Sequence, residues 1–346
     1  MCNIAGYVGT RQAAPILIDM FRRQEGWDCG HYVGMATVDG GSLYVEKDVG
    51  NLDMFLAGHD AYAMPGTVGV IHGRTPGKPG QINEHWAHPF VGSKGRFAMV
   101  VNGCGGKFAQ TIPPKNRLAY QQLREEGYEF ESLTEEGTPG KGQMPDGLFV
   151  HPTEIKCQRV QQRVDQGMSL TEACSAVSIE LPGERVSLIV NADEPECIIW
   201  SRINYPMFVA YADHGMYLAT TPQAMPEDAR NVTLLMACAS GKVYKDHIET
   251  VPYKAPGFTV APITPQVWKK AYEAMEAALT ENEMHHDHLD RLLQPLFDEA
   301  TCVPESAVNY AIMDYWERQG RLSVIKSYCP GTAPDSVAPR LTAKLK

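Results

Sequence analysis

Several features that would fix the class of a protein at once are missing from this sequence. Its nine cysteines are an odd number and form no Cys-x-x-Cys pair, so neither a disulfide framework nor a zinc site is indicated. No apolar run approaches the ~18 residues of a membrane-spanning helix. The N-terminus also lacks the basic stretch followed by an apolar run that a signal peptide requires. We therefore expect a cytoplasmic protein with reduced thiols.

Positive charge is also scarce. The chain has 31 Lys and Arg residues against 41 Asp and Glu residues, which gives a net charge of -10. A nucleic-acid-binding face, or a surface that adheres to anionic membranes, needs an excess of basic residues, so neither partner is expected. Apolar residues make up 44% of the 346 residues, enough for a sizeable core. The length favours one large domain and a smaller piece.

The hydrophobic pattern predicts strands at both ends of the large domain, with helices between them. A buried strand is expected over 3–9, and an amphipathic helix over 14–23. The further expected elements are a hairpin over 32–45, strands over 67–71 and 97–101, helices over 117–126, 153–165 and 169–177, and short strands between 186 and 220. This order suggests an α+β fold in which helices cover layers of sheet.

A proline-rich stretch divides the chain. Four prolines lie between 252 and 265, so we place a linker at 251–265, after a domain spanning 1–250. The segment 266–346 is expected to form a small helical extension, with helices over 265–284, 287–300 and 305–319 and a frayed chain end. Its helix followed by Gly-Arg-Leu resembles a winged-helix unit, but its acidic excess argues against DNA. We expect it to dock a partner or to form homo-oligomers.

Cysteine at position 2 is the first candidate catalytic residue. Once Met1 is removed, the thiol of Cys2 has its own α-amine beside it. An α-amine titrates near pH ~7.7–8.0, which suits it to accept a thiol proton. The same segment is also compatible with an ordinary buried cysteine at the start of a strand.

Three further segments offer candidate binding groups. Arg74 follows an apolar strand and enters a loop rich in glycine and proline, where a guanidinium can grip a carboxylate through two hydrogen bonds. Asn102 and Gly103 end another strand and can present a side-chain amide and a backbone N–H to one oxyanion. Asn-Gly is also the commonest hairpin turn. His88 is compatible with a pocket wall or with a buried core histidine.

In this order, the segments resemble the motifs of the class II glutamine amidotransferases, in particular the glutaminase half of glucosamine-6-phosphate synthases. That family begins with Cys-Gly-Ile-Val-Gly after Met and continues with Gly-Tyr-Asp, His-Thr-Arg-Trp-Ala-Thr, Asn-Ala-His-Pro and Val-His-Asn-Gly. The counterparts here lie at 2–6, 26–28, 72–77, 87–89 and 101–103. The resemblance continues through Thr220 and covers most of the predicted large domain.

The resemblance implies a four-layer αββα sandwich of the N-terminal-nucleophile hydrolase type, and it implies roles for matching residues. Cys2 would attack the side-chain amide of glutamine, and Asn102 and Gly103 would form the oxyanion hole. The substrate-binding residues would be Arg74, Thr75 and His88, with His88 lining the pocket. No cofactor and no metal are implied. The ammonia released would pass to a synthase, here a separate partner chain.

The sequence departs from the family's pattern in three places. Thr75-Pro76-Gly77 replaces the Trp-Ala-Thr that follows the arginine, and Glu25 stands where arginine is common. Pro152 stands where the family has an aspartate that binds the substrate ammonium. Losing a buried charge partner typically costs a few kcal/mol. Two alternatives to a glutaminase therefore stay open: an amidase for another amide, and a catalytically silent relative that binds an amino-acid-like ligand and regulates a partner.

A group of histidines in the extension raises the question of a metal. His285 and His288 lie one helical turn apart beside Asp287, a spacing compatible with shared ligation of an ion. A solvated helix face is the commoner explanation of such a pattern. We therefore predict no metal site.

Overall fold

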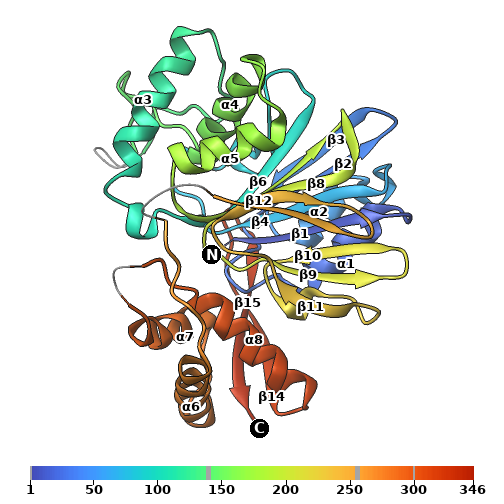
Figure 1. The fold of residues 1–346 in the computed structure, drawn as a ribbon, viewed down its shortest axis with the longest axis vertical. Helices are drawn as coiled ribbons and strands as arrows, with labels where there is room; N and C mark the ends of the chain where they lie inside the picture. Colours follow the sequence, from blue (N-terminus) through green and yellow to red (C-terminus); the bar gives the residue numbers. More distant parts are fainter. Residues whose placement is uncertain (1, 138–141, 254–257, 299–300) are drawn as a thin grey trace.

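The computed structural model describes residues 2–137, 142–253, 258–298 and 301–346 (Figure 1). Some predictions fall outside these ranges. They concern the removal of Met1, part of the proposed linker at 251–265, part of the loop over 137–147, and the end of the helix expected over 287–300.

Two antiparallel sheets form the centre of the molecule. The seven-stranded sheet has the order β11-β9-β10-β1-β4-β2-β3, and the six-stranded sheet has the order β13-β12-β8-β7-β6-β5. Their strands are β1 (Asn3–Gly9), β2 (Tyr32–Asp39), β3 (Ser42–Val49), β4 (Val68–Arg74), β5 (Phe90–Val91), β6 (Phe97–Cys104), β7 (Glu184–Asn191), β8 (Glu194–Arg202), β9 (Phe208–Ala212), β10 (Gly215–Ala219), β11 (Arg230–Leu234), β12 (Ala239–Val243) and β13 (Ile248–Pro252).

Strand β1 shows how side chains of alternating direction fill two different cores. Ile4 and Val8 point into the apolar layer between the two sheets, together with Val100 of β6. Ala5 and Tyr7 point to the opposite face and pack in another apolar cluster. Since successive side chains of a strand face opposite sides, a strand buried on both faces reads as continuously apolar, as β1 does.

Helices cover the outer faces of both sheets (Figure 1). On the seven-stranded sheet lies α1 (Ala13–Gln24), which buries Leu17 and Phe21. On the six-stranded sheet lie α3 (Ile112–Glu125), α4 (Pro152–Asp165) and α5 (Leu170–Glu180). A short helix, α2 (Leu52–Gly58), packs beside β2 and β3. The layers are therefore helix, sheet, sheet and helix, and the predicted αββα sandwich is confirmed.

The C-terminal extension contains more than helices. It has α6 (Pro265–Glu281), α7 (His286–Leu293) and α8 (Glu305–Arg318), followed by β14 (Leu322–Pro330) and β15 (Val337–Leu345). The two strands pair along their full length, so the prediction of a frayed chain end was wrong. Buried alternate residues of β15, such as Leu341 and Ala343, hold the strand against the rest of the protein.

The extension shares an apolar core with the large domain. Leu279, Leu289 and Trp316 belong to the same buried cluster as α1 and the outer face of the seven-stranded sheet. Backbone contacts add to this packing, since the N–H of Leu341 donates to the carbonyl of Gly26 at 2.9 Å. Among the residues with described positions, no helix is long and apolar enough to cross a membrane.

Candidate active site

Cys2 is held at the start of a central strand. It is partly exposed and directly precedes β1, which lies between β4 and β10 in the middle of its sheet. The Nδ2 of Asn3 donates to the carbonyl of Gln24 at 2.7 Å, and the Nε2 of Gln24 donates to the carbonyl of Ile4 at 3.0 Å. These bonds tie the end of α1 to the strand that follows Cys2.

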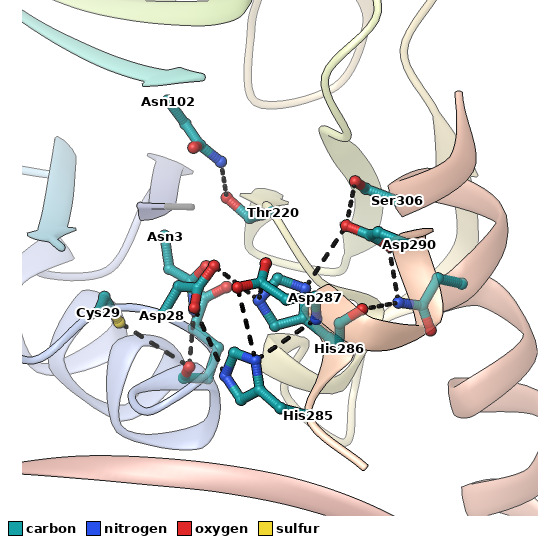
Figure 2. A network of polar contacts seen from close by, with 12 residues as sticks. Asn3, Asp28, Cys29, Asn102, Thr220, His285, His286, Asp287, Asp290 and Ser306 are labelled. Atoms are coloured by element: carbon teal, nitrogen blue, oxygen red, sulfur yellow. Dashed lines mark hydrogen bonds and ion pairs between the residues drawn. The ribbon is translucent and has the colours of Figure 1, made fainter. Parts of the chain in front are cut away.

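Asn102 reaches the nucleophile strand from the opposite sheet. The residue lies near the end of β6 and is fully buried, and its Nδ2 donates to Oγ1 of Thr220 at 3.4 Å (Figure 2). The same Oγ1 accepts the backbone N–H of Ile4 at 2.9 Å. Thr220 thus links the predicted oxyanion-hole amide to a backbone position only two residues from Cys2. The Oδ1 of Asn102 has no hydrogen-bond partner among the described residues.

Gly103 needs to be glycine for reasons of backbone geometry. Its φ is +126°, a conformation that residues with a Cβ atom rarely adopt. A Cβ built there would lie 2.1 Å from the carbonyl oxygen of Glu184 on β7. Asn102-Gly103 is therefore part of a sheet strand paired with β7, and the hairpin-turn alternative does not apply.

Arg74 occupies the end of β4 with part of its bonding capacity unused. Its guanidinium lies over the rings of Tyr32 and Trp86, at 4.6 Å and 5.6 Å from their centroids. One terminal nitrogen donates to Oε1 of Gln81 at 3.2 Å. The other is buried and has no hydrogen-bond partner within the described ranges. Thr75 follows in the loop and is half-exposed.

His88 lies inside the protein, only 2% exposed, in a stack of aromatic rings. Its ring centroid is 3.9 Å from that of His72 and 4.9 Å from that of His151. Burial holds the pKa of His88 well below its usual value, and the neighbouring histidines lower it further, so the ring is neutral. No described cavity counts His88 among its lining residues, and its predicted contact with substrate stays a prediction.

A cavity of about 370 Å³ lies beside residues that contact Arg74, but Cys2, Arg74, Asn102 and Gly103 are not among its lining residues. Gln81 and Trp86 contact Arg74 and also line this cavity, while Pro152, at the first turn of α4, forms part of the opposite wall. The other lining residues that matter here are Asn116, Phe149 and Arg185. None of the described lining residues is acidic, so the described wall of the cavity offers no carboxylate partner for an ammonium group.

Two acids close to Pro152 in the sequence, Glu154 and Asp146, are committed elsewhere. Glu154 is buried, and its carboxylate accepts the backbone N–H groups of Glu131 and Ser132 at 2.7 Å and 3.0 Å, together with the Ser132 hydroxyl. Asp146 accepts the Tyr120 hydroxyl at 2.6 Å. Each carboxylate therefore has a structural role and does not replace the aspartate that Pro152 displaces.

Arg185 is a lining residue that sequence reasoning missed. It stands directly opposite Gly103 in the β6–β7 pairing and lines the same cavity as Pro152. Burial lowers the pKa of its guanidinium, which nonetheless stays charged because the normal value is so high. Nothing in the spacing of the sequence marks this arginine, because its place depends on the pairing of two strands about 80 residues apart. The cavity is thus positively charged beside the oxyanion-hole pair.

The fold and these residues define a class of protein. A cysteine at the head of a central strand, in a fold of two stacked sheets covered by helices, has the arrangement of an N-terminal-nucleophile amide hydrolase. The chain is 31% identical over 254 residues to the glutamine–fructose-6-phosphate aminotransferase of Gloeobacter violaceus, covering 72% of this chain and 36% of that one. It is 30% identical over 245 residues to the enzyme of the same name from Mycobacterium tuberculosis, covering 68% and 34%.

Solved structures agree on the fold. The glutamine phosphoribosylpyrophosphate amidotransferase of B. subtilis superposes with a TM-score of 0.57 at 15% identity, over 94% of this chain and 66% of that one. No family model matches the chain. The protein is therefore a homologue of the class II glutamine amidotransferases, as its motifs predict, and it spans about a third of the length of the curated relatives that it matches.

Proposed function

We propose that this protein hydrolyses the side-chain amide of glutamine or a close relative and releases ammonia, using Cys2 as an N-terminal nucleophile. The observation that carries the proposal is the Asn102–Thr220–Ile4 connection, which brings the oxyanion-hole pair to the strand behind the thiol. In this proposal, the Asn102 amide and the Gly103 N–H are the donors that stabilise the charge developing on the amide oxygen.

The chemistry follows from the N-terminal position of the thiol. With Met1 removed, the α-amine of Cys2 accepts the thiol proton as sulfur attacks the carbonyl carbon. The amine then gives the proton to the departing nitrogen, so that ammonia leaves and a thioester remains. Water hydrolyses the thioester and restores the thiol. Arg74 binds the substrate carboxylate with its free nitrogen, and Thr75 and His88 complete the predicted substrate-binding set.

A second candidate substrate is an amide without an α-ammonium group. Pro152 removes the expected aspartate, Glu154 and Asp146 are engaged elsewhere, and Arg185 adds a positive charge to the cavity wall. Such a site favours a substrate whose amide is accompanied by carboxylate and no ammonium. The regulatory alternative, a silent relative, lacks support of this kind, because the nucleophile and both oxyanion-hole residues are kept.

The fate of the ammonia points to a partner. The curated relatives that the chain matches are named as aminotransferases. We infer that a synthase, as a domain or as a separate subunit, receives the ammonia here. We also place the protein in the cytoplasm, because nine free cysteines, Cys2 among them, suit a reducing compartment.

The test compares glutamine with 4-carbamoylbutanoate, which keeps the amide and the carboxylate but has no amino group. Wild-type protein should turn over both with kcat/KM values within a few-fold of each other. Pro152→Asp should raise kcat/KM for glutamine by roughly thirtyfold and leave the value for 4-carbamoylbutanoate unchanged. The factor is equivalent to about 2 kcal/mol for one restored charge contact. Pro114→Asp, an exposed proline at the start of α3, is the matched control and should change neither value.

Two results would contradict this assignment. One is wild-type protein that strongly prefers glutamine together with Pro152→Asp that gains nothing, which would place ammonium recognition elsewhere. The other is wild-type protein that binds either compound but hydrolyses neither, which would favour the regulatory alternative.

A further inference from the structure

Four potential metal ligands meet where the C-terminal extension contacts the large domain. Asp28 lies in the loop between α1 and β2, His285 is the N-cap of α7, and His286 and Asp287 begin that helix. Each can offer one nitrogen or oxygen atom such that all four atoms lie within 4.8 Å of one another. Figure 2 shows these side chains pointing toward one another. The expected solvated helix face holds for His288, which is exposed, but His285 and His286 are buried.

The cluster is compact enough to supply ligands to a single ion. A tetrahedral site with metal–ligand distances of about 2.0–2.1 Å places its ligand atoms roughly 3.3–3.4 Å apart. One oxygen of Asp28 lies 3.5 Å from Nε2 of His285, and its other oxygen lies 2.9 Å from Nε2 of His286. An oxygen of Asp287 lies 3.7 Å from Nε2 of His286. The ligand atom of His285 is Nε2, because its Nδ1 accepts the backbone N–H of Asp287.

The surroundings of His286 are those of a metal-binding imidazole. The ring is fully buried, and neither nitrogen makes a hydrogen bond of acceptable geometry with a residue that the structure describes, although carboxylate oxygens are close. Behind Nδ1, at 3.6 Å, lies Asp290. That carboxylate is itself fixed by the Ser306 hydroxyl at 2.6 Å and the Asn309 amide at 2.8 Å. A fixed carboxylate on the second ring nitrogen commonly orients a metal-binding histidine.

A small cavity supplies a path from solvent. Its volume is about 180 Å³, and Asp28, His285 and Asp287 line it together with His31 and Arg340. The two carboxylates outweigh the single arginine, so the cavity can admit a cation and deliver it to the cluster.

We propose that Asp28, His285, His286 and Asp287 form a binding site for one first-row divalent transition-metal ion. The bound ion links the start of α7 to the large domain. Two imidazoles and two carboxylates are a donor set suited to Zn²⁺, Co²⁺ or Mn²⁺. Two negative charges from Asp28 and Asp287 neutralise the ion in this buried place. Four protein ligands fill a tetrahedral site, so its role is structural.

The test uses the full chain, freed of metal with a chelator and then titrated with ZnCl₂ in an isothermal titration calorimeter. We expect one ion per chain and a higher Tm. Loading with Co²⁺ should give visible d–d absorption without the intense near-ultraviolet band of thiolate ligation, which distinguishes this site from binding at a cysteine.

Two variants make the assignment specific. Asp287→Asn, at a half-buried position that tolerates the change, should weaken Zn²⁺ binding at least tenfold. His288→Ala, on the exposed face of the same helix, should leave it within twofold. The proposal is overturned if wild-type protein shows no saturable binding of one ion per chain, if cobalt binds through thiolate, or if His288→Ala weakens binding as much as Asp287→Asn.

Discussion

At the scale of single residues, the surroundings of Arg74 suit the carboxylate binding that we propose for it. Tyr32 and Trp86 flank its guanidinium and fix its plane. Gln81 occupies one terminal nitrogen, and the other has no partner among the described residues. A substrate carboxylate can use both nitrogens once the Gln81 amide moves aside, which is a modest cost for a neutral hydrogen bond.

Arg74→Lys tests this clamp. Lysine keeps the charge but loses the planar fork and the stacking on two aromatic rings, so kcat/KM for the amide substrate should fall at least tenfold, mainly through KM. Steady-state kinetics of ammonia release provide the measurement. Arg23→Lys, on the exposed side of α1, is the control and should behave as wild type. A silent Arg74→Lys would remove Arg74 from the substrate-binding set.

At the scale of elements, the start of α7 is docked by buried charges. Burial alone would raise the pKa of Asp28, but His286 holds it below its usual range. In turn, Asp28 and Asp290 overcome the effect of burial on His286 and raise its pKa to about 9. Each ring or carboxylate is therefore charged because of its neighbour, and removing either one leaves the other buried without compensation.

The stability of metal-free protein should therefore depend on pH. The unfolded pKa of His286 is ~6.5, so its contribution is complete below that pH and is lost as the pH rises through about 9. Asp28 has a lowered pKa, so its contribution is present above ~3.9 and is lost as the pH falls.

A comparison of wild type with His286→Gln tests this pH dependence of the free energy of unfolding. In the presence of a chelator, the advantage of wild type in free energy of unfolding should be largest near pH 6 and should shrink by up to about 3 kcal/mol by pH 10. Urea unfolding at several pH values measures it. An advantage that stays constant, or grows, between pH 6 and pH 10 would mean that His286 is not protonated in the folded protein.

Some elements could be predicted from the sequence and others could not. The apolar run behind Cys2 and the amphipathic pattern that follows it predicted β1 and α1 closely, because both patterns are local. Strand β15 was missed because Pro339 interrupts its alternation close to the chain end. In the histidine group, helical spacing suggested His285 with His288, yet His285 is an N-cap outside the regular helix. Its partner Asp28 comes from a loop about 250 residues earlier, which no spacing rule reveals.

At the scale of the whole molecule, the extension and the large domain depend on one core. Leu289 of α7 is fully buried in the apolar cluster that α1 also occupies. Residues that lie far apart in the chain therefore contribute to the same hydrophobic burial, and loss of one part weakens the other. The boundaries proposed at 250 and 266 remain predictions.

Leu289→Ala should destabilise the whole chain. The cost for a buried leucine is about 2–5 kcal/mol. Because the core is shared, Cys2 reactivity and far-ultraviolet circular dichroism should be lost in one transition at a lower Tm. Leu292→Ala, on the same helix with a side chain 38% exposed, should shift the Tm much less. Two separate transitions in Leu289→Ala, with the Cys2 region unaffected, would show that the extension folds independently.

The central claim is that Cys2 is an N-terminal nucleophile, and mass spectrometry of the purified protein tests it most directly. Protein treated with a glutamine-mimicking electrophile should lack Met1 and carry one adduct, located on the Cys2 peptide. Cys2→Ala should take up no label and release no ammonia from amides, whereas Cys104→Ala, which changes an exposed cysteine, should be labelled and active as wild type. Retention of Met1 in active protein, or full activity of Cys2→Ala, would contradict the account.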